Sequence, residues 1–105
     1  MIKIEILLSV FNGEKYLIEL FESLLSQTYR NFRILIRDDF STDNSINIIK
    51  KYTKNYPDIF RLFHDSLGKS GTVNSFMHLL ENTETDYLMF CDQDDIWFNN
   101  KISKF

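Results

Sequence analysis

Residues that cross-link or interrupt a chain are scarce in this sequence. Its 105 residues include one cysteine, one proline and three glycines. A single cysteine excludes an internal disulfide, which fits a reducing compartment. No apolar run reaches the roughly 18 residues that a membrane-spanning helix needs. The N-terminus carries charge at Lys3 and lacks the cleavage site of a signal peptide. We therefore expect a cytoplasmic protein.

An excess of positive charge is absent as well. Twelve Lys and Arg stand against 15 Asp and Glu, and the net charge is -3. This argues against nucleic-acid binding through a basic surface. An anionic substrate would need local cations, from a metal ion or from selected Lys and Arg side chains. Hydrophobic residues make up 44% of the chain and aromatic residues 15%, enough for the core of one small domain.

Patterns typical of strands and of helices alternate along the chain. Apolar runs predict strands at residues 4–11, 32–36, 59–63 and 87–91. Apolar residues at helical spacing predict three helices between them: one from Glu14, one with the face Ile46, Ile49 and Tyr52, and one with the face Val73, Phe76, Met77 and Leu80. Ser41, Thr42 or Asp43 could cap the second of these. A further helix is expected from Asn99.

This alternation predicts an α/β fold, a mostly parallel sheet with helices on both faces. Ligands of such sheets bind outside the carboxyl ends of the strands. Three polar segments follow strands here, at residues 9–13, 38–41 and 92–95. They should open on one edge of the sheet and could form one site.

The last of these segments is acidic. Asp92, Asp94 and Asp95 follow an apolar strand, and like charges so close together repel. A divalent metal with oxygen ligands, carrying a phosphorylated substrate, would relieve that repulsion. In an extended backbone Asp92 and Asp94 point the same way, so one could bind the metal and the other a ribose hydroxyl. The alternative is helix capping, which needs only one carboxylate.

The other two segments offer further candidates. Asp38 and Asp39 should face opposite ways, and one could accept a hydrogen bond from a base N–H; the alternative is loop solvation with capping. Ser9 and Asn12 could contact a base or a phosphate. For Asn12 alone, a simple turn with Gly13 is the favoured interpretation.

Lys69, in the polar loop before the third helix, could hold a phosphate. Gly68 and Gly71 would allow close backbone approach, with a helix N-terminus behind them. The segment lacks P-loop spacing, and a flexible loop is the alternative. Three residues without partners at metal-ligand spacing are interpreted as structural: His64, His78 and Cys91. Trp97 could line a sugar pocket or cap the core.

Four segments, in order, resemble the family 2 glycosyltransferases of GT-A fold: Ser9–Gly13, Leu25–Tyr29, Arg37–Asp43 and Phe90–Trp97. The run Asp-Gln-Asp-Asp-Ile-Trp, with Asn100–Ile102 after it, is most similar to bacterial rhamnosyltransferase-type members. The resemblance covers essentially the whole chain, and four ordered motifs are far more specific than any one of them.

The resemblance implies an inverting enzyme that transfers a sugar from a UDP- or dTDP-linked donor to a hydroxyl of a saccharide or lipid-linked acceptor, with Mg²⁺ or Mn²⁺. It implies that Asp39 contacts the pyrimidine base, with Ser9 near it. Asp92 would contact the ribose and Asp94 the metal. Lys69 loosely matches a basic residue of the family. Asp38 would be mainly structural.

In the family, the general base lies well downstream of the Asp-x-Asp motif, whereas this chain ends ten residues after Asp95. We therefore expect residues 1–105 to be the N-terminal nucleotide-sugar-binding part of a glycosyltransferase domain without its acceptor half. It would bind nucleotide weakly, transfer no sugar alone, and could self-associate through exposed apolar surface. Family members suggest cell-surface polysaccharide synthesis, with possible peripheral membrane association. The alternatives are a non-catalytic nucleotide-binding or interaction module and a receiver-like phosphoacceptor domain.

Overall fold

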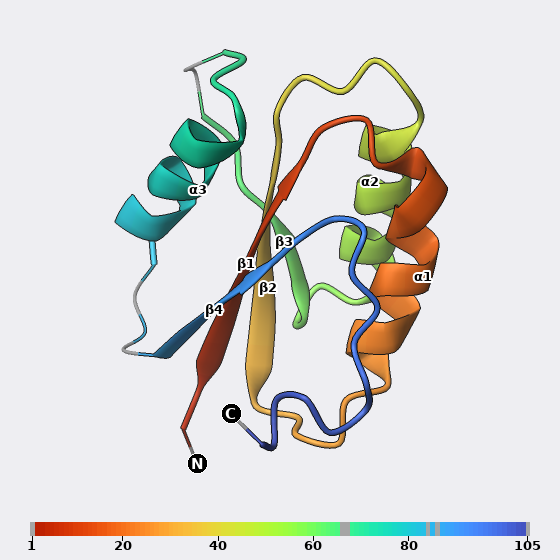
Figure 1. Ribbon diagram of the computed structural model, residues 1–105, viewed down its shortest axis with the longest axis vertical. Coiled ribbons are helices and arrows are strands. Elements are labelled where there is room, and N and C mark those ends of the chain that lie inside the picture. Colours follow the sequence, from red (N-terminus) through yellow and green to blue (C-terminus); the bar gives the residue numbers. More distant parts are fainter. Residues whose placement is uncertain (1, 66–67, 84, 86, 105) are drawn as a thin grey trace.

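The computed structural model describes residues 2–65, 68–83, 85 and 87–104. Strands and helices alternate as β1 (Ile4–Val10), α1 (Glu14–Leu25), β2 (Phe32–Asp38), α2 (Ser45–Asn55), β3 (Phe60–Leu62), α3 (Thr72–Glu81) and β4 (Tyr87–Cys91). The strands form one sheet in the order β3-β2-β1-β4, and each neighbouring pair is parallel. Helices α1 and α2 cover one face and α3 covers the other (Figure 1). The predicted α/β fold is confirmed.

The two central strands are buried on both faces, because helices lie on both sides of them. Ile6 and Ile34 are partners in register and belong to the larger core under α1 and α2. Leu7 and Leu35 point to the other face, where they pack with Leu79 of α3. Side chains alternate between faces along a strand. Odd-numbered residues of β1 and β2 therefore lie on the α3 side.

Strand and helix boundaries differ from the sequence-based ones by up to two residues. β2 continues to Asp38 rather than ending at residue 36, and β1 ends at Val10. The expected cap of α2 is wrong in detail, because Asn44 is the N-cap and makes no side-chain capping bond. The Asp43 carboxylate instead accepts a hydrogen bond from the Ser45 N–H at 2.9 Å.

The expected helix from Asn99 is wrong, because residues 99–104 form turns. The buried side chain of Gln27 explains this. Its amide donates to the carbonyl of Phe98 at 2.6 Å and accepts from the N–H of Ile102 at 3.1 Å. The Asn99 carbonyl accepts from the Thr28 N–H at 2.8 Å. These backbone groups are bonded to the end of α1 and are not available for a helix.

The predicted apolar face of α3 is largely wrong. Val73 is 75% exposed and Met77 48%, whereas α3 buries Ser75 and Leu79. The Ser75 hydroxyl accepts a hydrogen bond from Arg37 at 3.2 Å, which draws that side of the helix to the sheet. The face of α2 is shifted in a similar way, since Ile48 replaces Ile46 beside Ile49 and Tyr52.

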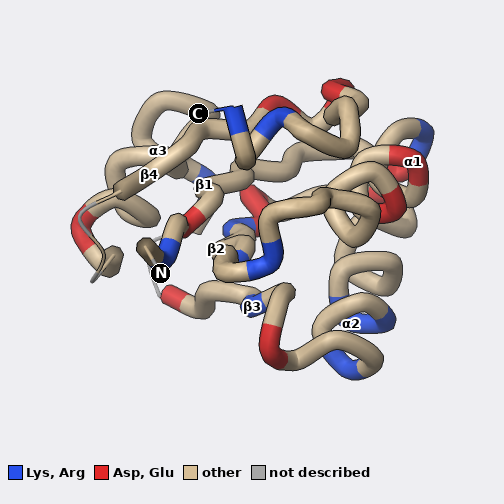
Figure 2. The backbone as a smooth tube through the Cα atoms, turned by 90° about the horizontal axis from the view of Figure 1, so that it is seen from below, with Lys and Arg blue, Asp and Glu red and all other residues tan. Residues whose placement is uncertain are grey.

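Charged residues of both signs are interspersed around the described part of the molecule rather than divided between two faces (Figure 2). In that same part of the chain, every helix is too short or too polar to cross a membrane.

Candidate functional site

The loops that follow β1, β2 and β4 are joined to one another by hydrogen bonds. The Phe11 N–H donates to the side chain of Gln93 at 2.9 Å, and the Asn12 N–H donates to the Ser41 hydroxyl at 2.9 Å. The Asn12 side chain in turn accepts from the Thr42 N–H at 2.8 Å. Asn12, which has a φ of 49°, therefore bridges two loops. The expectation that the three polar segments open on one edge is confirmed.

A cavity of about 300 Å³, the acidic cavity, lies at this edge. Its lining residues are Ser9, Phe11, Tyr16, Thr72, Phe76, Asp92, Gln93 and Asp94. The structure thus brings three predicted site residues together from strand ends more than 80 residues apart in the chain. Ser9 is buried, whereas Asp92 and Asp94 are exposed to solvent. The binding roles of these residues stay predictions.

Lys69 lies beside the acidic cavity through its contact with Phe11. The ammonium nitrogen is 4.0 Å from the centroid of the Phe11 ring, within the range of an attractive cation–π interaction. Phe11 lines the cavity, and Lys69 is itself exposed. A cation and an aromatic ring therefore stand together next to two carboxylates.

Asp39 is turned toward the loop before α3. One carboxylate oxygen accepts from Arg37 at 2.6 Å and from the Ser70 N–H at 2.8 Å, and the other accepts from the Gly71 N–H at 2.9 Å. Burial acts to raise the pKa of Asp39, but the hydrogen bonds from Arg37 and these two N–H groups outweigh it and hold the pKa below its usual value. These two N–H groups belong to the loop that was considered above for phosphate binding, and here they are engaged with Asp39. Base contact by Asp39 stays a prediction.

Arg37 is a residue of this site that sequence reasoning missed. It is 2% exposed, and it donates to the Asp65 carboxylate at 2.7 Å and to the Gly68 carbonyl at 2.7 Å. Burial acts to lower the pKa of Arg37. Its hydrogen bond to Asp65, and to a smaller extent its hydrogen bond to Asp39, outweigh burial and keep the pKa raised. A basic residue directly after the apolar run 32–36, next to two aspartates, was the available signal. Arg37 ties the end of β2 to the loop before α3.

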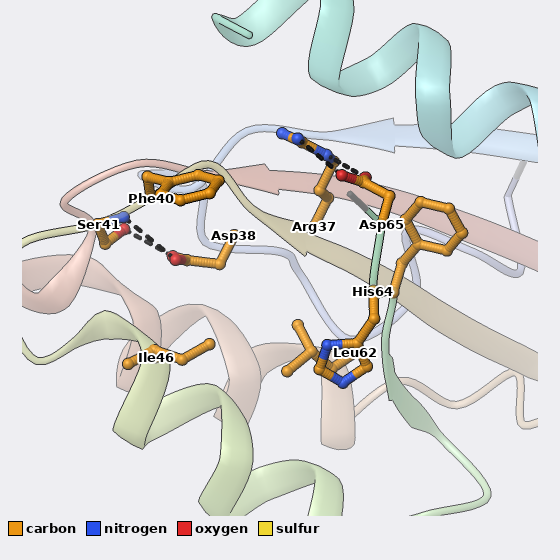
Figure 3. Close-up of a pocket in the computed structure, with 9 residues that line it drawn as sticks. Arg37, Asp38, Phe40, Ser41, Ile46, Leu62, His64 and Asp65 are labelled. Carbon is orange, nitrogen blue, oxygen red and sulfur yellow. Dashed lines mark hydrogen bonds and ion pairs between the residues drawn. The ribbon is translucent and has the colours of Figure 1, made fainter. Parts of the chain in front are cut away.

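Asp38 faces the opposite side of the sheet, as predicted for adjacent residues. It lines a second cavity of about 320 Å³ with Phe40, Ser41, Ile46 and His64 among others, and Figure 3 shows this pocket. Its carboxylate accepts from the Ser41 hydroxyl at 2.6 Å and from the Ser41 N–H at 3.1 Å. These bonds close the turn after β2, which gives Asp38 a structural role.

The acidic pair fits a metal that is shared with a substrate. Among residues 2–65, 68–83, 85 and 87–104, no three His, Cys, Asp or Glu side chains gather as a ready-made metal site. Asp92 and Asp94 do line the same cavity. Mg²⁺ commonly takes one or two carboxylates, with waters and substrate phosphates completing its shell. This donor set is therefore suited to a metal whose other ligands come from a diphosphate.

Trp97 and Cys91 are core residues. Trp97 is 3% exposed and packs in the larger core, so it is not a wall of the sugar pocket. Cys91 is buried as well. Burial, helped by the nearby charge of Asp95, raises the pKa of its thiol to about 12, as expected for a packing role.

Residues 5–105 match the sequence family described as glycosyl transferase family 2. The chain belongs to this family. It is 33% identical over 102 residues to the putative glycosyltransferase EpsE of Bacillus subtilis, covering 97% of this chain and 36% of that protein. It is 34% identical over 98 residues to the dTDP-rhamnosyl transferase RfbG of Shigella flexneri, covering 90% of this chain and 34% of that protein.

A solved structure has the same fold. The structure of S. aureus TarS in complex with UDP-GlcNAc superposes with a TM-score of 0.84 and 25% identity, over 98% of this chain and 30% of that one. The predicted GT-A fold is thereby confirmed. The chain spans about a third of the length of these three proteins.

Proposed function

We propose that the acidic cavity binds the nucleoside-diphosphate part of a UDP- or dTDP-linked sugar, and that the whole protein transfers this sugar with inversion to an acceptor hydroxyl. The observation that carries the proposal is the meeting of Ser9, Asp92 and Asp94 in one cavity. The names of two similar proteins support it, since one is a dTDP-rhamnosyl transferase and the other was solved with UDP-GlcNAc.

Each side chain at the cavity has a role in this proposal. Asp92 contacts the ribose, and Asp94, with Asp92 beside it, holds Mg²⁺ or Mn²⁺. When bound, the metal neutralises charge on the diphosphate leaving group. Lys69 adds a second cation, and the Phe11 ring beside it gives an apolar wall. Asp39, at the end of β2, contacts the pyrimidine base, with Ser9 near it.

Transfer also needs a general base that takes the proton from the attacking hydroxyl. Asp92 and Asp94 are assigned to the donor and its metal, so we place the base outside residues 1–105. Residues 1–105 alone would then bind nucleotide weakly and transfer no sugar. The proposed acceptor is a saccharide or a lipid-linked saccharide in cell-surface polysaccharide synthesis, used on the cytoplasmic side of the membrane.

The test is a calorimetric titration of the complete protein with UDP and with dTDP, each with and without Mn²⁺. The matched pair of variants is Asp94→Ala, in the cavity, and Asp58→Ala, at an exposed position before β3. We expect metal-dependent binding in the wild type and in Asp58→Ala, and its loss in Asp94→Ala. Equal binding by both variants would contradict the metal role of Asp94. The nucleotide that binds more tightly identifies the donor base.

A further inference from the structure

The side-chain amide of Gln93 pairs with the peptide of Phe11, which is 82 residues away in the sequence. Its oxygen accepts from the Phe11 N–H at 2.9 Å, and its nitrogen donates to the Phe11 carbonyl at 3.0 Å. The backbone pairing of β1 with β4 stops at Leu8 and Cys91. Beyond that point the Gln93 side chain, rather than the backbone, connects the two chain segments.

Gly13 leaves the space that this amide occupies. A Cβ atom at Gly13 would lie 2.8 Å from the side-chain oxygen of Gln93 and 3.1 Å from its amide carbon. The φ of Gly13 is -99°, which any residue can adopt. A larger residue at this position would therefore displace the end of the Gln93 side chain from the Phe11 backbone.

The amide holds two parts of the acidic cavity in place. Gln93 stands between Asp92 and Asp94 in the sequence, and the Phe11 ring lines the same cavity. Both ends of the Gln93 amide are engaged with the Phe11 backbone. The oxygen and the nitrogen of the Gln93 amide are thus each bonded to the loop after β1.

We propose that Gln93 is a positioning residue for donor binding, whose amide locks the acidic loop to the Phe11 peptide so that the aromatic ring and the two carboxylates face one cavity. The proposal rests on the proposed function of that cavity. It assigns a role to the residue between the two aspartates, and it predicts that a side chain at residue 13 would disturb the Gln93 amide.

The experiment is a double-mutant cycle on the complete protein with Gln93→Ala, Gly13→Ala and the double variant. The probe is UDP or dTDP, whichever the wild type binds more tightly, titrated with and without Mn²⁺. We expect each single substitution to weaken binding in Mn²⁺ about tenfold, the size of the loss of a small number of hydrogen bonds. The double variant should bind no more weakly than Gln93→Ala, because no amide remains for the new methyl group to displace.

A second readout separates positioning from mere support of the fold. The ratio of nucleotide affinities with and without Mn²⁺ measures the coupling between nucleotide and metal. We expect Gln93→Ala to reduce this ratio, whereas a purely structural role would leave it unchanged. Gln93→Met keeps the length of the side chain and adds no charge but cannot bond to the Phe11 backbone, so it should reduce the ratio too. It replaces Gln93→Ala if that variant fails to fold.

The outcomes are distinct. Suppose that the wild type binds nucleotide and that the affinity ratio is unchanged in the Gln93 variants. This result would overturn the inference and leave the proposed function standing. Strictly additive losses in the cycle would also overturn it, because they would show that Gly13 and Gln93 act independently. A wild type that binds neither nucleotide with Mn²⁺ would overturn both the inference and the proposed function.

Discussion

The Arg37 guanidinium donates to the Asp39 carboxylate across 2.6 Å, and both residues are 2% exposed. The pair joins the end of β2 to the loop before α3, since Asp39 also accepts the N–H groups of Ser70 and Gly71. Asp65 holds the other side of the guanidinium at 2.7 Å. This ion network fixes the position from which Lys69 reaches Phe11.

Removal of Arg37 should destabilise the protein strongly. Arg37→Ala leaves the buried Asp39 without its cationic partner, and breaking a buried pair from one side costs about 3 kcal/mol of unfolding free energy or more. Urea denaturation followed by circular dichroism measures the loss. The exposed Arg61→Ala is the matched control and should change stability by about 0.5 kcal/mol or less. Equal effects of the two substitutions would contradict the role of Arg37.

The same pair predicts a loss of stability in acid. The pKa of Asp39 lies below its usual value in the folded protein, so its charged form is favoured by folding. The contribution of Asp39 to the free energy of unfolding is fully present above its pKa in the unfolded chain, about 3.9. It is lost as the pH falls through the lower pKa of Asp39 in the folded protein. We expect Asp39→Asn to flatten the fall in unfolding free energy below about pH 4. Asp58→Asn should keep the wild-type slope, and a slope unchanged in Asp39→Asn would refute the assignment.

The single thiol should be inert in the native state. Burial raises the pKa of Cys91 to about 12. At pH 8, about four units below that pKa, almost all of the thiol is protonated and the reactive thiolate is scarce. Iodoacetamide should label Cys91 rapidly in urea and only slowly in buffer, as read by mass spectrometry. Labelling at the same rate in both conditions would show that Cys91 is accessible in the folded protein.

The strands were predictable from sequence because each is a short, mostly apolar run, and the two central strands are buried by their neighbours. The buried faces of the helices were less predictable. Val73 and Met77 have helical spacing, but Arg37 draws Ser75 to the sheet, so α3 turns its apolar residues outward. The expected helix after Asn99 failed because Gln27 takes its backbone groups. Both errors come from polar contacts between residues far apart in the chain.

The candidate site was also only partly predictable from the sequence. Ligands bind at the carboxyl ends of parallel strands, and this rule correctly predicts that Ser9, Asp92 and Asp94 meet at one edge of the sheet, where they line one cavity. The pairs that hold the loops were missed. Arg37 and Asp65 are 28 residues apart, and Phe11 and Gln93 are 82 apart. No local pattern announces such a contact, because its partners are set by the packed fold.

Two phenylalanines in different surroundings give a test of the core. Phe21 is fully buried. Its ring centroid lies 4.9 Å from the ring centroid of Tyr52 and 5.0 Å from that of Phe60. Phe21→Ala should cost about 3–5 kcal/mol of unfolding free energy, through lost burial and the cavity that it leaves. Phe98 is 85% exposed, so Phe98→Ala should cost about 0.5 kcal/mol or less. Urea denaturation measures both, and comparable losses would contradict the described packing.

Lys69 should contribute to nucleotide affinity mainly through its charge. Its ammonium group is 4.0 Å from the Phe11 ring centroid and exposed to solvent. Its attraction for a diphosphate in the acidic cavity would therefore act through solvent and be screened by salt. We expect Lys69→Met to weaken binding of UDP about fivefold at low ionic strength and less at 1 M salt, where charges are screened beyond about 3 Å. Calorimetry at both salt concentrations measures this, with Lys54→Met on α2 as the control. A loss of the same size at both concentrations would show that Lys69 acts through packing on Phe11 rather than through charge.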